Sequence, residues 1–276
     1  MIKLNNKVVE LNRFPDGCLL IKEYTEKDFE SDRSAEILWT FENNEELIAL
    51  MYLTRHLQSH GISNIKLVMP YIPNARQDRV KKDEDVFTLK YFAEIINSLN
   101  YTSVRVLDPH SNVSEALIDN IIVDSPKRNI LKVIDKIKSD RNLIMFYPDE
   151  GAMKRYSGMI DRAFAFGIKK RDWSSGEIQG LEVSGMTEHI AGSDVLIVDD
   201  ISSRGGTFFF SAKALKALGA ENIYLYISHC ENTILEGPVI DSGLITKIYT
   251  TNSIFTKEHS MIEVIDYEYW KSYVTY

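Results

Sequence analysis

Runs of apolar residues alternate along the chain with amphipathic stretches, and this alternation predicts an α/β fold. Four consecutive apolar residues at 195–198 are typical of a strand that a parallel sheet covers on both faces. The stretch at 199–207 is polar and contains glycine, and a helix is expected at 208–218. A loop of small residues between a strand and a helix can turn its N–H groups toward one anion.

The same reasoning predicts further elements on both sides of this unit. Helices are expected at 44–60, where Gly61 ends the helix, and at 86–99, 130–137 and 152–159. Strands are expected at 19–24, 36–41, 64–71, 103–107, 143–147, 163–168, 223–228, 247–251 and 262–265.

The composition narrows the class of protein. The 276 residues suffice for two modest domains, and 44% apolar with 26% charged residues is typical of a globular protein. No apolar run is long enough to span a membrane, and the residues that follow Met1 lack the apolar core of a signal peptide. Two cysteines make no disulfide framework, so a cytoplasmic protein is expected. The net charge of −8 argues against nucleic acid as a partner.

Two adjacent carboxylates mark the place where chemistry is expected. Carboxylates do not bind phosphate, but they accept hydrogen bonds from sugar hydroxyls or hold Mg²⁺ through water. A ribose with a 5-phosphate suits both the carboxylates and the anion-binding loop. The alternative is an ordinary strand-to-helix turn with solvated aspartates. The sequence therefore predicts a ribose-phosphate site formed by Asp199, Asp200, Ser202, Ser203, Arg204, Gly205, Gly206 and Thr207.

A second segment with phosphate-binding character follows the strand expected at 64–71. Arg76 and Arg79 flank Gln77, and the planar guanidinium group, which never loses its charge, suits phosphate oxygens. This pattern predicts a polyphosphate clamp with one amide available to a base or sugar. A solvated charged loop is the alternative.

His110 and Asp149 also follow expected strands. Ligands of α/β sheets bind at the carboxyl ends of the strands, so His110 is well placed. However, a lone histidine is more often structural, and an aspartate in this position commonly caps a helix.

The run at 195–207 resembles the phosphoribosyl-pyrophosphate loop of the phosphoribosyltransferase superfamily. The letters at 70–79 resemble the P-Y-x-x-x-A-R-Q-D-R signature of the ribose-phosphate pyrophosphokinases. The resemblance implies two phosphoribosyltransferase-like (Rossmann-like) domains, each a mainly parallel sheet flanked by helices. We expect an ATP-binding domain at 1–127 and a ribose-phosphate-binding domain at 128–276, whose last residues pack back on the first. The ATP site is expected between the domains.

The resemblance also implies the reaction, in which the β,γ-diphosphate of ATP moves to the anomeric hydroxyl of a 5-phosphorylated ribose and AMP is released. The similar segments at 106–110 and 147–155 imply that His110 and Asp149 hold the Mg²⁺ of ATP. The basic segment at 169–171 resembles the flexible loop of that family. There Lys169 and Arg171 would stabilise the diphosphate during transfer.

The segment at 13–18 resembles the family's R-F-x-D-G-E, which contacts adenine across a subunit boundary. It implies a homo-oligomer, a dimer or a hexamer, although Cys18 stands where the family usually has glutamate. The residues expected to bind ATP are therefore Phe14, Asp16, Arg76, Gln77, Arg79 and His110.

The chain departs from the family pattern in other places. Only twelve residues precede Arg13, where the family usually has an extra strand and helix. Acidic residues at 83–85 replace a basic segment, so allosteric control by phosphate or ADP is not expected. Ser203 and Arg204 replace the aspartate and threonine of the usual D-T-G-G-T loop.

The added arginine favours an acceptor with more charge beyond the 5-position, such as ADP-ribose. Viral enzymes that make ADP-ribose 1-pyrophosphate resemble short members of this family, so the acceptor stays open between ADP-ribose and ribose 5-phosphate. Two other functions are alternatives. A phosphoribosyltransferase leaves the residues at 76–79 unexplained, and a catalytically silent regulatory homologue leaves Lys169 and Arg171 unexplained.

Overall fold

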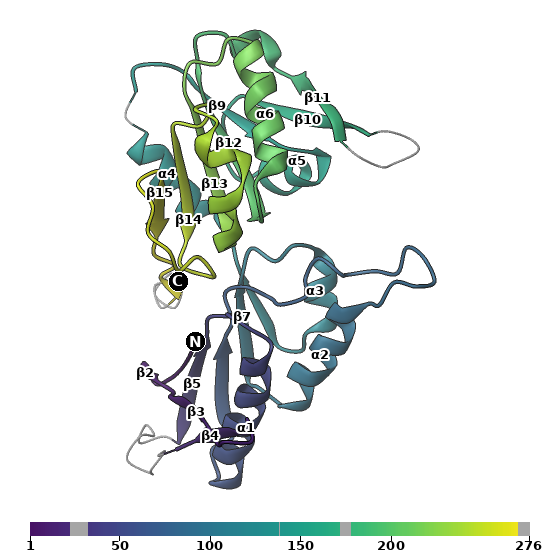
Figure 1. The fold of residues 1–276 in the computed structure, drawn as a ribbon, viewed down its shortest axis with the longest axis vertical. Coiled ribbons are helices and arrows are strands. Elements are labelled where there is room, and N and C mark those ends of the chain that lie inside the picture. Colours follow the sequence, from purple (N-terminus) through teal and green to yellow (C-terminus); the bar gives the residue numbers. More distant parts are fainter. Residues whose placement is uncertain (23–32, 138, 172–177, 270–276) are drawn as a thin grey trace. The chain divides into compact units, whose positions relative to one another are not determined.

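The protein is described by a computed structural model that covers residues 1–22, 33–137, 139–171 and 178–269. The chain divides into two compact units, Met1–Ser125 and Pro126–Tyr276. Each unit contains a mainly parallel sheet flanked by helices, which confirms the α/β class (Figure 1). The expected domain boundary at 127/128 lies at the start of the second unit.

The first unit has a six-stranded sheet in the order β2-β1-β5-β6-β7-β8 and a separate β3-β4 hairpin. Strands β5 to β8 are parallel, whereas β1 runs antiparallel to both β5 and β2. The elements are β1 (Ile2–Leu4), β2 (Lys7–Val8), β3 (Leu11–Arg13), β4 (Leu19–Ile21), β5 (Ser34–Trp39), α1 (Glu45–Ser59), β6 (Asn64–Val68), α2 (Thr88–Ser98), β7 (Ser103–Leu107), α3 (Asn112–Leu117) and β8 (Ile121–Asp124).

The core of the first unit lies on one face of its sheet. Alternate strand residues such as Ile37 and Leu67 pack with Leu50 and Leu53 of α1 and with Phe92 of α2. This alternation arises because successive side chains of a strand point to opposite faces.

The second unit has a seven-stranded sheet in the order β11-β10-β9-β12-β13-β14-β15, in which only β11 is antiparallel to its neighbour. The elements are α4 (Lys127–Lys136), β9 (Leu143–Tyr147), α5 (Glu150–Tyr156), β10 (Phe164–Arg171), β11 (Ile178–Gly185), the 3₁₀ helix η2 (Thr187–His189), β12 (Asp194–Ser202), α6 (Gly206–Ala217), β13 (Ile223–Cys230), the 3₁₀ helix η3 (Asn232–Glu236), α7 (Pro238–Asp241), β14 (Lys247–Thr251) and β15 (Ile262–Ile265).

Strand β12 lies in the middle of this sheet and is covered on both faces. Val195 and Ile197 belong to a core cluster with Phe208 of α6, whereas Leu196 and Val198 belong to a cluster with Tyr156 of α5. All four strand residues are buried, which confirms the interpretation of this apolar run. In the part of the chain that the structure describes, no helix is both long and apolar enough to cross a membrane.

The structure differs from the expected elements in several places, and β11 and η2 were not expected. The strand of the apolar run continues through both carboxylates and ends at Ser202, because β12 keeps pairing with β13 as far as Cys230. Ser202 was expected in the loop, so this expectation was wrong. Several short elements gave no readable period in the sequence: β1, β2, β3, α3, β8, η3 and α7.

A buried ion pair joins the two last strands of the first sheet. Arg105 Nη1 of β7 donates to Asp124 Oδ1 of β8 at 2.6 Å, and both side chains are largely buried. The pair lies on the strand that leads directly to His110. Removal of one partner would leave the other charge in a poorly solvated position.

We therefore predict that Asp124→Ala lowers the free energy of unfolding by about 3 kcal/mol, measured by urea denaturation. Lys154→Ala, which breaks the exposed Lys154–Glu150 pair, serves as the control and should cost less than about 0.5 kcal/mol. The double variant Arg105→Met with Asp124→Leu should recover most of the loss. Equal small effects of Asp124→Ala and Lys154→Ala would contradict the importance of the buried pair.

Candidate active site

The candidate ribose-phosphate residues lie at one edge of the second sheet. Asp149 follows the carboxyl end of β9, Asp199 and Asp200 lie near the end of β12, and Glu231 follows β13. These three strands are neighbours and parallel, so their carboxyl ends reach the same edge. This edge is where α/β sheets bind ligands.

The loop that follows β12 has the backbone geometry of an anion site. Gly205 has φ +75°, a left-handed conformation that favours glycine, and α6 begins at Gly206. The N–H groups of the first turn of a helix have no carbonyl partner within that helix. They and the positive end of the helix dipole therefore favour an anion at Gly206 and Thr207.

The paired carboxylates are held in a strongly negative environment. Desolvation and the adjacent carboxylate of Asp200 raise the pKa of Asp199 well above its ordinary value, and Asp149 adds to the shift. Asp149 is also the N-cap of α5, where its Oδ1 accepts from the Ala152 N–H at 3.0 Å. The helix-capping alternative for Asp149 is therefore correct, and the same side chain lies close enough to influence Asp199.

Arg155 of α5 compensates part of this negative charge. Its Nη1 lies 3.5 Å from Oδ2 of the buried Asp200, and its guanidinium stacks over the Tyr156 ring at 5.6 Å from the centroid. An arginine held in this way limits how Asp200 can rotate.

The two residues that depart from the usual loop both contact carboxylates. Ser203 Oγ donates to Glu231 Oε2 at 2.7 Å, and Arg204 Nη2 donates to Glu236 Oε2 at 3.1 Å. Ser202 is buried, and its hydroxyl donates to the Ser203 carbonyl at 3.1 Å. The charge that Arg204 adds to the loop is therefore balanced locally by Glu236.

The basic segment of the first unit follows β6 and lies beside His110. Asp78 is buried, and Arg79 donates to both of its carboxylate oxygens, from Nε at 2.8 Å and from Nη2 at 3.1 Å. These bonds lower the pKa of Asp78, and Ser111 and His110 lower it further. The structure thus brings the segments at 70–79 and 106–110 together at the carboxyl ends of β6 and β7.

The other two predicted residues of this segment are on its surface. Gln77 Oε1 accepts from Thr88 Oγ1 at 2.6 Å, and its carbonyl accepts from the Leu89 N–H, so Gln77 helps to begin α2. Arg76 is exposed. Both lie in the loop between β6 and α2, where a ligand can reach them.

The expected adenine contacts lie on the hairpin of β3 and β4. Phe14 is half exposed, and Asp16 Oδ1 accepts from the Cys18 N–H at 2.9 Å within the turn. Arg13 Nε donates to Glu45 of α1 at 3.0 Å and ties the hairpin to the first unit. An exposed aromatic ring at the tip of an anchored hairpin is available to a partner.

Lys169 and Arg171 are placed only by their backbone. They lie in β10, which pairs antiparallel with β11 and has a register shift between Lys170 and Arg171. Their side chains, and the expected loop at 172–176, lie outside the described residues.

No cluster of three or more histidine, cysteine, aspartate or glutamate side chains that could hold a metal occurs among the residues the structure describes. The two expected ligands belong to different units, His110 to the first and Asp149 to the second. Mg²⁺ commonly takes one or two carboxylates and completes its shell with water and substrate phosphates. The mutual repulsion of Asp149, Asp199 and Asp200 is a condition that a divalent cation would relieve.

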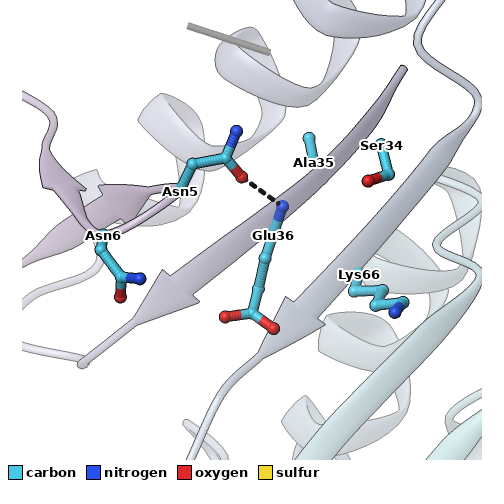
Figure 2. A pocket seen from close by; sticks show the side chains of 6 residues that line it. All are labelled: Asn5, Asn6, Ser34, Ala35, Glu36 and Lys66. Atoms are coloured by element: carbon cyan, nitrogen blue, oxygen red, sulfur yellow. Dashed lines mark hydrogen bonds between the residues drawn. The ribbon is translucent and has the colours of Figure 1, made fainter. Parts of the chain in front are cut away.

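A polar cavity of about 160 Å³ lies in the first unit, and its lining contains none of the predicted site residues (Figure 2). Asn5 lies over the start of β5 and accepts from the Glu36 N–H at 2.9 Å, and Lys66 of β6 lies nearby. Its residues from β5 are the first three of that strand, so the cavity opens at the edge opposite the carboxyl ends. It is therefore separate from the candidate residues of the first unit.

Comparison with known proteins gives matches across both units. Residues 2–99 match the N-terminal domain of ribose phosphate pyrophosphokinase. Ribose-phosphate pyrophosphokinase 1 of Listeria monocytogenes is 30% identical over 230 residues, which are 81% of this chain and 70% of the relative. The Thermococcus kodakarensis ribose-phosphate pyrophosphokinase is 28% identical over 252 residues, which are 90% of this chain and 86% of the relative.

The crystal structure of phosphoribosylpyrophosphate synthetase from Mycobacterium smegmatis has the same fold, with a TM-score of 0.77. It is 18% identical, and the match covers 94% of this chain and 86% of that one. The fold and the matched sequences define an ATP-dependent diphosphotransferase. The chain belongs to the ribose-phosphate pyrophosphokinase family.

Four residues at these edges were not predicted as site residues. Asp78 and Arg155 lie within the recognised segments, and their roles depend on partners that only the structure reveals. Glu231 and Glu236 pair with loop residues that precede them by 28 and 32 positions. No local pattern in the sequence identifies such pairs.

We predict that Arg155→Met disfavours ionisation of the Asp199–Asp200 pair, because the cation 3.5 Å from Asp200 is lost. The pKa of Asp199 is raised in the native state, so the stability that this group contributes falls as pH rises through that native pKa. ¹³C NMR titration of the carboxyl groups measures the shift, with Arg155→Lys as the control that keeps the charge. An unchanged titration in Arg155→Met would contradict the assigned role.

Proposed function

We propose that this protein transfers the β,γ-diphosphate of ATP to the anomeric hydroxyl of ribose 5-phosphate, which releases AMP and yields phosphoribosyl pyrophosphate. The oxygen of the anomeric hydroxyl attacks the β-phosphorus, the bond from the α–β bridging oxygen to the β-phosphorus breaks, and AMP leaves with that oxygen. The proton of the hydroxyl passes to solvent or to a nearby base.

The arrangement at the end of β12 carries this proposal. Asp199 and Asp200 come shortly before the left-handed Gly205 and the N-terminus of α6. Ribose hydroxyls can donate to the carboxylates while the 5-phosphate accepts from the N–H groups of Gly206 and Thr207. One ligand then supplies hydrogen-bond donors to the carboxylates and an anion to the N–H groups.

The first unit supplies the groups proposed to bind ATP. Arg76, Gln77 and Arg79 lie in the loop after β6, and the buried Asp78 holds the guanidinium of Arg79. His110 lies beside this pair after β7. We assign the phosphates of ATP to this loop and the adenine to the exposed Phe14 and to Asp16 of a second copy of the chain, in a homo-oligomer.

We propose Mg²⁺ as the metal, with His110 and Asp149 as its protein ligands. Bound there, it would neutralise the charge on the phosphates of ATP. Lys169 and Arg171 of β10 are proposed to stabilise the moving diphosphate. Little covalent work falls to the protein in such a transfer, so positioning and charge neutralisation provide most of the rate enhancement.

ADP-ribose is the second candidate acceptor, and the observation that favours it is Arg204. Its side chain is exposed next to the proposed 5-phosphate site and can reach a further phosphate. The pair with Glu236 lies on the surface, where such pairs contribute little and are easily exchanged for a stronger partner. The relatives are named for ribose phosphate, so ribose 5-phosphate is the first candidate.

The test is the release of AMP from ATP. We predict AMP formation that requires both a divalent metal and a ribosyl acceptor, and that stops when the metal is chelated. Parallel reactions with ribose 5-phosphate and with ADP-ribose identify the acceptor. Formation of ADP would show ordinary phosphoryl transfer and exclude the proposed reaction. AMP release without any acceptor would show that the reaction needs no ribosyl substrate.

For the acceptor, we predict that Arg204→Thr lowers kcat/KM for ADP-ribose about tenfold, the value of one charge-assisted hydrogen bond. The effect on ribose 5-phosphate should be smaller, since backbone N–H groups hold a monophosphate. The matched variant Glu236→Ala keeps Arg204 but removes its hydrogen-bond acceptor, and should improve the use of ADP-ribose. Equal effects of Arg204→Thr on both acceptors would remove Arg204 from the choice of acceptor.

A further inference from the structure

We propose that Glu231 is a positioning residue for the loop of residues 203–206, here called the phosphate loop. Its carboxylate fixes the Ser203 hydroxyl and thereby the backbone that receives the 5-phosphate. This inference rests on the proposed function, because it takes the phosphate loop to bind that group. It adds to the site a residue that lies outside the loop on the neighbouring strand β13.

Glu231 is attached to the start of the phosphate loop at two points. Its Oε2 accepts from Ser203 Oγ at 2.7 Å, and its backbone N–H donates to the Ser202 carbonyl at 2.8 Å. Both bonds cross from the end of β13 to the end of β12. The backbone hydrogen bond fixes the main chain of Glu231 next to β12, so the Glu231 carboxylate can orient Ser203.

The segment that begins with Glu231 also supports the rest of the loop. A Cβ at Gly237 would lie 1.8 Å from the Arg204 carbonyl oxygen, so the two backbones are in direct contact. A Cβ at Gly205 would lie 2.7 Å from Val239 Cγ2. Ser203, Arg204 and Gly205 thus each contact the segment 231–239. The contact of this segment with Ser203 includes the hydrogen bond to the Glu231 side chain.

A carboxylate near a phosphate site would repel the ligand unless hydrogen-bond donors of the protein surround the carboxylate. Thr233 Oγ1 donates to the same Oε2 atom at 3.2 Å, so two hydroxyls share the charge of Glu231. The Glu231 carboxylate contacts the phosphate loop through the Ser203 side chain. We therefore assign to Glu231 the role of hydrogen-bond acceptor, not that of a contact to the ligand, and a neutral acceptor of the same shape should replace it.

The first test compares Glu231→Ala with Glu231→Gln in the full-length protein. Glu231→Ala should raise KM for ribose 5-phosphate about tenfold, the effect of losing one hydrogen bond to a charged group, with a smaller change in kcat and none in KM for ATP. Glu231→Gln should stay within about twofold of the wild type, since its amide oxygen can accept from Ser203. Equal damage by both variants, or an unchanged KM in Glu231→Ala, would overturn the proposal.

Two more variants test the pair if Glu231→Ala folds poorly. Ser203→Ala removes the donor and should raise KM for ribose 5-phosphate to the same extent, and the double variant should add nothing further. Thr233→Ala removes another partner of Glu231 without touching the loop and serves as the control, with an expected change below about twofold. Additive effects of Ser203→Ala and Glu231→Ala would show that the two residues act separately and would contradict the assignment.

A readout without turnover separates this inference from the proposed function. Inorganic phosphate should raise the thermal unfolding midpoint of the wild type and of Glu231→Gln, and should protect Glu231→Ala at about tenfold higher concentration. Failure of AMP release together with this pattern would reject the reaction but keep the role of Glu231. Absence of protection in the wild type, or equal protection of all variants, would reject the role of Glu231.

Discussion

The close contact between two backbone segments is the constraint on which the candidate site depends. Gly237 has no room for a side chain beside the Arg204 carbonyl, and Gly205 takes a left-handed conformation against Val239. These contacts set where β12 stops and where α6 begins. These contacts constrain the turn between the paired carboxylates at the end of β12 and the N–H groups at the start of α6.

The electrostatics of the second unit follow from that geometry. Asp149, Asp199 and Asp200 come from adjacent strand ends, and burial together with the neighbouring carboxylates raises the pKa of Asp199. Arg155 offsets part of this charge, and Glu231 and Glu236 hold the two unusual residues of the phosphate loop. In the first unit, the buried Asp78 similarly holds Arg79 beside His110. The buried carboxylates Asp78 and Asp200 are thus paired with arginines before a substrate binds, which lowers the entropic cost of binding.

Much of the fold could be predicted because its signals are local. The apolar run at 195–198 indicated a doubly covered strand, and the polar, glycine-containing stretch after it indicated the turn and helix. The short strands β1 and β3 have three residues each, which is too few to show a period. Pairs such as Ser203–Glu231 could not be predicted, because they depend on β13 lying next to β12. That order follows from the packing of the whole sheet, and no local pattern records it.

The most direct test of this account is a structure determined with ribose 5-phosphate bound. We predict that the phosphate oxygens lie within hydrogen-bond distance of the N–H groups of Gly206 and Thr207. The ribose hydroxyls should donate to Asp199 and Asp200, and the Ser203–Glu231 hydrogen bond should persist. Ribose 5-phosphate bound elsewhere, with no ligand at the end of β12, would contradict the account.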